Sequence, residues 1–439
     1  MRARFLSDYG MVFVLLALCA VLSVATYAEQ YPSGAAGGEA LASDVIAKTP
    51  DGARILLIVR DTEDDGAFAD ALTARLQASG RTVQETVRGQ PSDARKALVR
   101  FAAAPEKPQV IAATKEAGDW GVLHDIPAGF PALSDARLMV PRGYGWPYFL
   151  QPVNLVNITN QIAIIAIVAI GMTMVILTGG IDLSVGSVIA LSAVLATLLI
   201  RDRAGAENAT AIGMATCCLV AILASGLIGL TNGLLVTVFE TPPFIITLGM
   251  MLIARGLARI LSEGQSIYRV PDSFTTLGSG TIAGAPIAVL LMLTLYAMAH
   301  LFMAHTTAGR YIYAVGSNIK AAQYSGVPVK RIIVSVYVVS GILAGLGGVI
   351  MASQLKGAQP TYAANYELTV IVAVVIGGTS LSGGEGKVLG TLIGALIMAV
   401  AQNGMNLMSV DSDSQMVVLG AILIAAVLLD RLKRRASVR

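Results

Sequence analysis

The chain has 439 residues, of which 55% are hydrophobic and only 13% are charged, with a formal net charge of +3. A soluble domain carries roughly 25% charged residues, so this composition excludes an ordinary soluble protein and indicates a polytopic membrane protein. Residues 29–150 hold 13 Lys and Arg against 16 Asp and Glu, whereas the rest of the chain holds 18 against 12. The acidic excess therefore belongs to one segment.

The first apolar run covers residues 11–27 and follows Arg2 and Arg4. This pattern fits either a first transmembrane helix or a secretory signal with Ala28 as the cleavage residue. We favour a retained helix over residues 1–28, because the charge rule at the C-terminus requires one more span before the later ones.

Residues 29–150 predict a small soluble α/β segment. Apolar or alternating strand patterns at 54–59, 82–87 and 109–113 are separated by helical patterns at 67–78 and 93–104. This βαβαβ order predicts a parallel sheet, because parallel strands need helical crossovers. No GxGxxG motif follows the first strand, which excludes a dinucleotide site.

Four acidic residues in the loop 60–66 precede the first of these helices. Acidic side chains are favourable at a helix N-terminus, and we prefer this explanation to a metal site. The three cysteines and three histidines are scattered, with no spacing typical of a metal centre, a disulfide framework or a nucleophilic triad. We therefore expect no metal and no enzymatic chemistry.

Residues 151–435 form a membrane core with nine further apolar spans. With the first helix they predict an all-α membrane protein of about ten transmembrane helices, the nine lying at 157–178, 183–200, 211–238, 243–261, 285–305, 331–352, 366–378, 388–408 and 413–430. The loop 306–331 and the tail 431–435 are basic and should be cytoplasmic. Both termini then lie inside, and residues 29–150 lie outside.

An octet at residues 179–186 recurs at 377–384 with the shared pattern GGxxLSxG. Glycine-interrupted apolar segments at corresponding positions of two halves are typical of transporter cores. The predicted topology places both loops on the cytoplasmic side. Their candidate residues are Gly179, Gly180, Asp182, Ser184, Gly377, Gly378, Ser382 and Gly384.

Asp182 stands just before an apolar run, so its carboxylate is expected to cap the helix that follows, near the membrane interface. We prefer this to a functional intramembrane acid. Ser184 and Ser382 are expected to satisfy helix-end amides in the same way.

Residues 381–387 resemble the signature of ABC ATPases and hint at a phosphate loop. The GxxxxGK[ST] spacing fails, because Leu381 occupies the first glycine position and Val388 follows Lys387. The chain is therefore not expected to bind ATP or another cofactor.

Several polar residues lie inside or at the ends of the predicted spans. Neutral side chains of this kind suit a polyhydroxylated ligand better than an ion, although bonds between helices explain most of them individually. The candidate translocation path consists of Gln161, Thr173, Thr247, Glu367, Asn403 and Asn406.

The cytoplasmic loop contains a short helical stretch that begins near Asn318, stops at Gly326 and is followed by Pro328. Such a helix could serve as a docking element for a partner. The alternative is an ordinary connecting loop.

Four longer runs resemble the permease subunits of ribose-type ABC sugar importers: 171–187 (GMTMVILTGGIDLSVGS), 243–256 (PFIITLGMMLIARG), 320–326 (KAAQYSG) and 366–384 (YELTVIVAVVIGGTSLSGG). The resemblance implies a permease homodimer in the lipid of the inner membrane, a separate ATPase subunit, an extracytoplasmic sugar-binding protein and no nucleic-acid partner. It also implies that a coupling helix meets the ATPase through Lys320, Ala321, Ala322, Ser325 and Gly326.

The chain departs from that family in three places. Ile319 and Lys320 stand where acids usually precede the paired alanines, Thr369 replaces an acid after Glu367, and residues 29–150 replace a short loop. The insertion could be a platform for the binding protein, a tethered partial receptor or an inert addition. Rival functions are a permease for an autoinducer, a nucleoside or a branched-chain amino acid, and a sensor or transporter that works without ATP.

Overall fold

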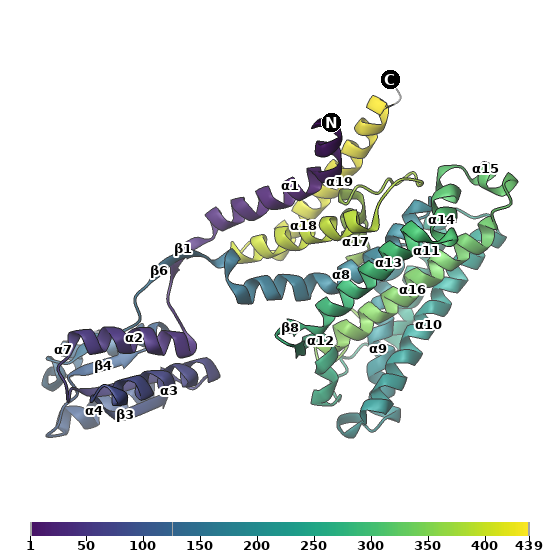
Figure 1. Cartoon of the computed structure of the whole chain (residues 1–439). Helices are drawn as coiled ribbons and strands as arrows, with labels where there is room; N and C mark the ends of the chain where they lie inside the picture. Colours follow the sequence, from purple (N-terminus) through teal and green to yellow (C-terminus); the bar gives the residue numbers. More distant parts are fainter. Residues whose placement is uncertain (1, 125, 438–439) are drawn as a thin grey trace. The chain divides into compact units, whose positions relative to one another are not determined.

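The computed structural model describes residues 2–124 and 126–437, with side chains described from residue 10 onward except at 125, 426 and 429–437. The described chain forms two compact units. One consists of residues 27–147, and the other combines residues 2–26 with 148–437 (Figure 1).

The unit 27–147 is built on a four-stranded, fully parallel sheet with the strand order β3-β2-β4-β5. Its helices and strands are β1 (Tyr27–Gln30), α2 (Gly34–Lys48), β2 (Arg54–Arg60), α3 (Glu63–Ala78), β3 (Thr82–Gly89), α4 (Pro91–Ala103), β4 (Val110–Ala113), α5 (Lys115–Gly118), α6 (Gly121–His124), α7 (Ile126–Gly129), η1 (Pro131–Leu133), β5 (Arg137–Met139) and β6 (Tyr144–Pro147). Neither α2 nor β5 was predicted from the sequence.

Strand β2 is the centre of this sheet because both of its faces are covered. Residues 55–59 of β2 have no exposed surface. Ile55, Leu57 and Val59 pack in the cluster with α2 and α3, while Leu56 and Ile58 pack in the cluster with α4 and the short helices. Side chains alternate across a strand, so this continuous apolar run covers both faces of a three-layer α/β unit.

The second unit is a helical bundle. Its elements are α1 (Arg2–Ala25), η2 (Tyr148–Leu150), α8 (Pro152–Leu177), α9 (Val185–Arg203), η3 (Ala206–Asn208), α10 (Ala211–Val238), α11 (Pro243–Leu261), η4 (Asp272–Thr275), α12 (Thr276–Ser279), β7 (Thr281–Ile282), β8 (Ala285–Pro286), α13 (Ile287–His305), α14 (Thr307–Ser317), α15 (Ile319–Tyr324), α16 (Val329–Gln354), α17 (Tyr366–Ile376), α18 (Val388–Leu407) and α19 (Ser412–Ser437).

Seven of the described helices are long and apolar enough to cross a membrane, namely α8, α9, α10, α11, α13, α16 and α18. Three shorter apolar helices lie at 10–25, 366–376 and 412–425. Helix α17 has 11 residues and is about 16 Å long, whereas the hydrocarbon core of a bilayer is about 30 Å thick. The expected span at 366–378 is therefore too short to cross a bilayer as a helix alone.

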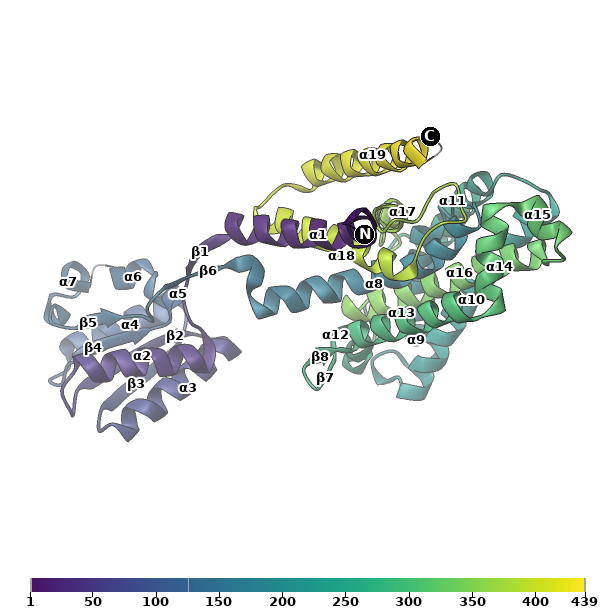
Figure 2. The ribbon, with the colours of Figure 1, turned by 45° about the horizontal axis from the view of Figure 1, so that its top comes forward.

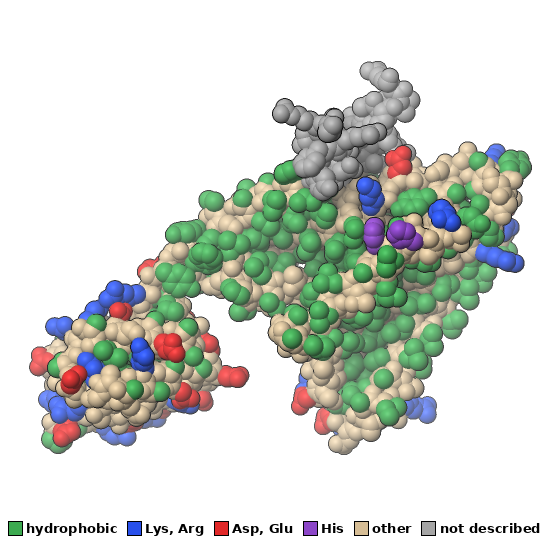
Figure 3. All heavy atoms as spheres, in the orientation of Figure 1, with side chains coloured by type: hydrophobic (Ala, Val, Ile, Leu, Met, Phe, Trp, Pro, Cys, Tyr) green, Lys and Arg blue, Asp and Glu red, His purple; other side chains and the backbone are tan. Residues whose placement is uncertain are grey.

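The visible surfaces of the two units differ in composition. Hydrophobic side chains dominate the bundle, whereas acidic and basic side chains are spread over the unit 27–147 (Figure 3). The bundle therefore presents its apolar surface outward, as a protein solvated by lipid does.

Helices α10 and α16 run side by side (Figures 1 and 2) and approach closely at glycines. A Cβ on Gly229 would overlap the carbonyl oxygen of Tyr337, and one on Gly341 would overlap that of Ser225. Small residues at such positions let membrane helices pack backbone to backbone.

We expect Gly229→Ala to destabilise the bundle by about 1–3 kcal/mol, the usual cost of overpacking a close contact. Thermal unfolding of the full chain in detergent would measure this as a lower midpoint. Gly249→Ala on α11 is the matched control, because no atom lies within 4 Å of a Cβ built there. Equal midpoints for the two variants would contradict the proposed backbone packing.

Candidate functional site

The two GGxxLSxG segments follow helices that end in the same way. At the end of α8, the Gly179 and Gly180 amides donate to the carbonyls of Ile176 and Val175. At the end of α17, Gly378 and Thr379 donate to Val375 and Val374. Both are Schellman motifs, in which a left-handed residue satisfies the last free carbonyls of the helix.

The two copies of the GGxxLSxG motif differ by one residue in their position relative to the preceding helix end. The left-handed glycines are Gly179 (φ +82°) and Gly378 (φ +89°), whereas the sequence alignment pairs Gly179 with Gly377. Seven residues separate α8 from α9, but eleven separate α17 from α18. The second segment, which also holds left-handed Gly383, Gly384 and Gly386, is therefore the longer loop.

The two loops and helix α14 meet at one point. The Gly384 amide donates to the carbonyl oxygen of Leu177 at 2.9 Å. Gly316 of α14 fills the space beside this bond, because a Cβ there would overlap the Leu177 oxygen and lie 2.5 Å from the Gly384 nitrogen. Tyr313 donates its hydroxyl hydrogen to the carbonyl of Gly386 at 2.9 Å. We call this contact of α14 with residues 177 and 383–386 the repeat junction.

Helix α15 follows α14 directly, and Asn318 caps it through a 3.0 Å bond from the Ala321 amide to its side-chain oxygen. Lys320, Ala321, Ser325 and Gly326 are exposed. Ala322 is buried, so it packs α15 against the bundle and does not present itself to a partner. Tyr324, which was not among the predicted coupling residues, is 92% exposed.

Asp182 lies in the interior of the bundle with 2% of its surface exposed. Its Oδ1 accepts hydrogen bonds from the amide (3.0 Å) and hydroxyl (2.6 Å) of Ser184, and its Oδ2 accepts one from Ser340 of α16 (2.9 Å). Asn232 of α10 donates to Ser184 Oγ at 3.1 Å. This Asp182 network joins the first repeat loop to α10 and α16.

The expectation that Asp182 caps a helix near the interface is met only in part: its carboxylate accepts the amide of Ser184 at the start of α9, but it lies deep in the bundle. Ser184 is the N-cap residue of α9 and makes no side-chain capping bond, while Asp182 bonds Ser340, the twelfth residue of the 26-residue α16. Ser382 lies six residues before α18, so it cannot satisfy the amides of that helix. Both segments do share a local turn, since Ser382 donates its amide to Ser380 Oγ as Ser184 does to Asp182.

Two polar atoms beside the Asp182 network are buried without a hydrogen-bond partner among the described residues. They are Oδ1 of Asn232 and the hydroxyl of Tyr337. Tyr337 lies close to Gly180, where a Cβ would be 2.6 Å from its hydroxyl oxygen. Unsatisfied buried polar groups are rare in folded proteins, so these two atoms distinguish the region from an ordinary apolar core.

The six candidate path residues do not form one continuous lining. Thr173 and Thr391 share a 2.8 Å bond between α8 and α18, and Thr247 donates to the carbonyl of Ile181 at 3.2 Å. Asn403 exchanges two hydrogen bonds with Asn154 of α8. These contacts tie helices together.

The other three path candidates differ from these. Gln161 and Asn406 are exposed. Glu367, in the first turn of α17, is 6% exposed, and its Oε2 has no hydrogen-bond partner in the described part of the chain. A Cβ on Gly186 would overlap this oxygen, so the carboxylate lies against the start of α9, where free helix amides favour a negative charge.

In the unit 27–147, the acidic loop after β2 is organised around one ion pair. Asp65 accepts from the Arg60 amide, the Arg60 guanidinium and Thr114. Burial acts to raise the pKa of Asp65, but these hydrogen bonds hold its pKa below the usual range. Within residues 2–124 and 126–437, no group of three or more His, Cys, Asp or Glu side chains is placed to hold a metal ion.

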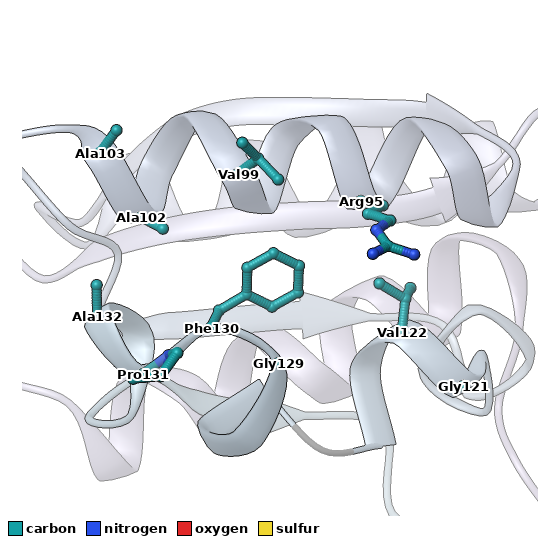
Figure 4. A pocket seen from close by; sticks show the side chains of 10 residues that line it. All are labelled: Arg95, Val99, Ala102, Ala103, Gly121, Val122, Gly129, Phe130, Pro131 and Ala132. Carbon is teal, nitrogen blue, oxygen red and sulfur yellow. The ribbon is translucent and has the colours of Figure 1, made fainter.

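A cavity of about 750 Å³ lies between α4 and the short helices of this unit. Phe130 and Val122 face Arg95 and Val99 across it (Figure 4). Among the described residues its lining is apolar apart from Arg95 and includes no pair of groups suited to acid–base chemistry.

Seven long apolar helices packed around interrupted, repeated segments define a membrane transport protein of the permease class. The family described as "Branched-chain amino acid transport system / permease component" matches residues 154–427, and the chain belongs to this family. It is a family of transport permeases and not of enzymes. Residues 1–153 lie outside the match.

Similar proteins include the ribose import permease of Bacillus subtilis, 43% identical over 65% of this chain and 87% of that protein. The ribose import permease of Escherichia coli is 42% identical over 66% and 88%. The D-allose transport system permease of E. coli is 36% identical over 65% and 85%. No solved structure matches the chain.

We expect Asp182→Ala to lower the thermal unfolding midpoint in detergent, because it leaves the Ser184 and Ser340 hydroxyls without their acceptor, at about 1–3 kcal/mol for each unsatisfied group. Asp182→Asn keeps one acceptor oxygen and should have a smaller effect. Asp413→Ala, at an exposed site on α19, is the control. A midpoint for Asp182→Ala equal to that of the control would disprove the structural role of the network.

Proposed function

We propose that this chain is the membrane conduit of an ATP-driven importer for a ribose-like monosaccharide. It would work as a homodimer, with a separate ATPase subunit inside the cell and a sugar-binding protein outside. The similar ribose and allose permeases support the class of substrate. The repeat junction supports an ATP-driven mechanism, because it joins the α14–α15 segment to the loops that follow α8 and α17.

The proposed topology has ten crossings with both termini in the cytoplasm and residues 29–150 outside. Helix α17 would complete its crossing together with the irregular residues 356–365 before it. Helix α1 would be retained, because Leu22 is buried against Gly404 of α18 and Thr26 accepts a 3.0 Å bond from Tyr148. Removal of residues 1–28 would eliminate both contacts and leave Gly404 and the Tyr148 amide without these partners.

The proposed coupling surface is the exposed side of α15. Lys320, Ala321, Ser325 and Gly326 belong to it, and Tyr324 is its largest exposed side chain. Exposed aromatic residues are common energetic anchors in protein interfaces. A displacement of α15 would reach the repeat junction through α14, because only Asn318 separates the two helices.

Strong selectivity is assigned to the partner that delivers the sugar. The polar groups of the path candidates Thr173, Thr247 and Asn403 form hydrogen bonds with neighbouring segments of the bundle. Few of these groups are therefore left to bind a sugar tightly. A branched-chain amino acid is the second candidate solute, because the family description names that class.

Uptake of labelled ribose into proteoliposomes that contain the chain with a cognate ATPase and binding protein tests this function. We expect uptake only with ATP, and Tyr324→Ala should reduce it about tenfold or more through loss of a docking anchor worth roughly 2 kcal/mol. Ile212→Ala, which is also highly exposed, is the control. ATP-independent uptake would disprove the proposal, and full uptake by Tyr324→Ala would remove the docking role of α15.

A further inference from the structure

Two short strands carry the chain into and out of the unit 27–147. Strands β1 and β6 pair antiparallel, with Tyr27 opposite Pro147 and Gln30 opposite Tyr144. They form a two-stranded sheet of their own, separate from the parallel sheet. We call this pair the β1–β6 ribbon, and it lies where the labels β1 and β6 stand in Figure 1.

The ribbon exposes large aromatic side chains. Tyr27 is 64% exposed, Tyr144 49% and Trp146 45%. In an antiparallel pair, directly opposed residues share a face, so Trp146 and Tyr144 lie on one face and Tyr27 on the other. The Tyr27 ring covers Gly145, where a Cβ would overlap its hydroxyl oxygen. Both faces therefore expose aromatic surface.

This arrangement would be unfavourable in water alone. An isolated two-stranded ribbon is marginally stable at best, and solvated aromatic rings on both faces do not stabilise it. Tyr and Trp are favoured in the interfacial layer of a membrane, where the ring is in apolar surroundings and the polar atom meets water and headgroups. The composition of the ribbon thus fits a lipid headgroup layer.

Covalent continuity limits how far the ribbon can lie from the membrane. Tyr27 is two residues beyond the end of α1, and Pro147 is five residues before α8. The pairing continues toward the helices, because Tyr148 donates its amide to the Thr26 carbonyl at 3.0 Å and Phe149 donates to Thr26 Oγ1 at 3.1 Å. The membrane end of the ribbon is therefore held closed.

The ribbon also has the right length for this layer. Four residue pairs at about 3.4 Å each extend roughly 10 Å from the first to the last. The interfacial layer is roughly 5–8 Å thick on each side of the hydrocarbon core. Trp146 pairs with Ala28, in the second of the four residue pairs counted from the end next to α1 and α8.

We infer that the β1–β6 ribbon is a membrane-interface anchor that binds phospholipid headgroups and upper acyl chains of the outer leaflet through Trp146, Tyr27 and Tyr144. This inference concerns residues 27–30 and 144–147 and holds whichever solute is transported.

Fluorescence quenching in lipid nanodiscs tests the anchor in the full-length chain. The sequence contains two tryptophans, Trp120 and Trp146, so Trp120→Phe isolates Trp146 and Trp146→Phe isolates Trp120. Trp120 is partly buried against the core cluster on the α4 side of the parallel sheet and serves as the matched control. The probe is phosphatidylcholine brominated on the upper acyl carbons, compared with the unbrominated lipid.

We expect brominated lipid to reduce Trp146 emission by about half, as for an interfacial indole, and to leave Trp120 emission nearly unchanged. Equal, weak quenching of both residues would overturn the inference. A blue-shifted Trp146 emission without quenching would also overturn it, because a protein surface and not lipid would then cover the ribbon. Near-identical circular dichroism of the two variants is the check that both are folded.

Discussion

The structure depends on satisfying the backbone where helices α8 and α17 stop within an apolar bundle. In a hydrocarbon environment each unpaired amide or carbonyl costs several kcal/mol, so an interrupted helix survives only with internal partners. Left-handed Gly179 and Gly378 close the two helix ends, and the Gly384 amide takes the Leu177 carbonyl as its acceptor. Each interruption is thereby completed by bonds inside the protein.

The same requirement links the site to the rest of the bundle. Asp182 follows the first helix end and needs donors, which Ser184 and, from α16, Ser340 supply. Helix α16 in turn packs on α10 through glycines and begins just after α15. The α14–α15 segment, both repeat loops and the centre of α16 therefore form one connected set of contacts. We propose that a displacement of α15 is transmitted to the loops through this packed backbone.

Hydropathy and local patterns predicted the helices closely, because the apolar runs are long and end at polar or glycine residues. The predicted bounds 211–238 and 243–261 coincide with α10 and α11. Helix α2 was missed because three glycines, at positions 34, 37 and 38, obscure its helical period, although they allow close packing on Phe68 and Asp64.

The site was harder to predict than the helices. The Asp182–Ser340 bond joins residues 158 apart, and no local pattern carries that information. Helix capping was the simplest local explanation for Asp182, but tertiary packing placed the carboxylate at the middle of α16. The repeat motif did identify two loops that meet, while the one-residue displacement between them arises from where each helix ends.

We propose that the repeat junction transmits motion from α15 to the two loops. Gly316→Ala tests it directly, because the added methyl group would overlap the Leu177 carbonyl and separate α14 from the second loop. The measurement is the ratio of sugar taken up to ATP hydrolysed in proteoliposomes with the partner subunits, with Gly256→Ala as the control at a site where no atom lies within 4 Å. We predict that Gly316→Ala retains ATP hydrolysis but loses most of its uptake, and an unchanged ratio would contradict the proposed role of the repeat junction.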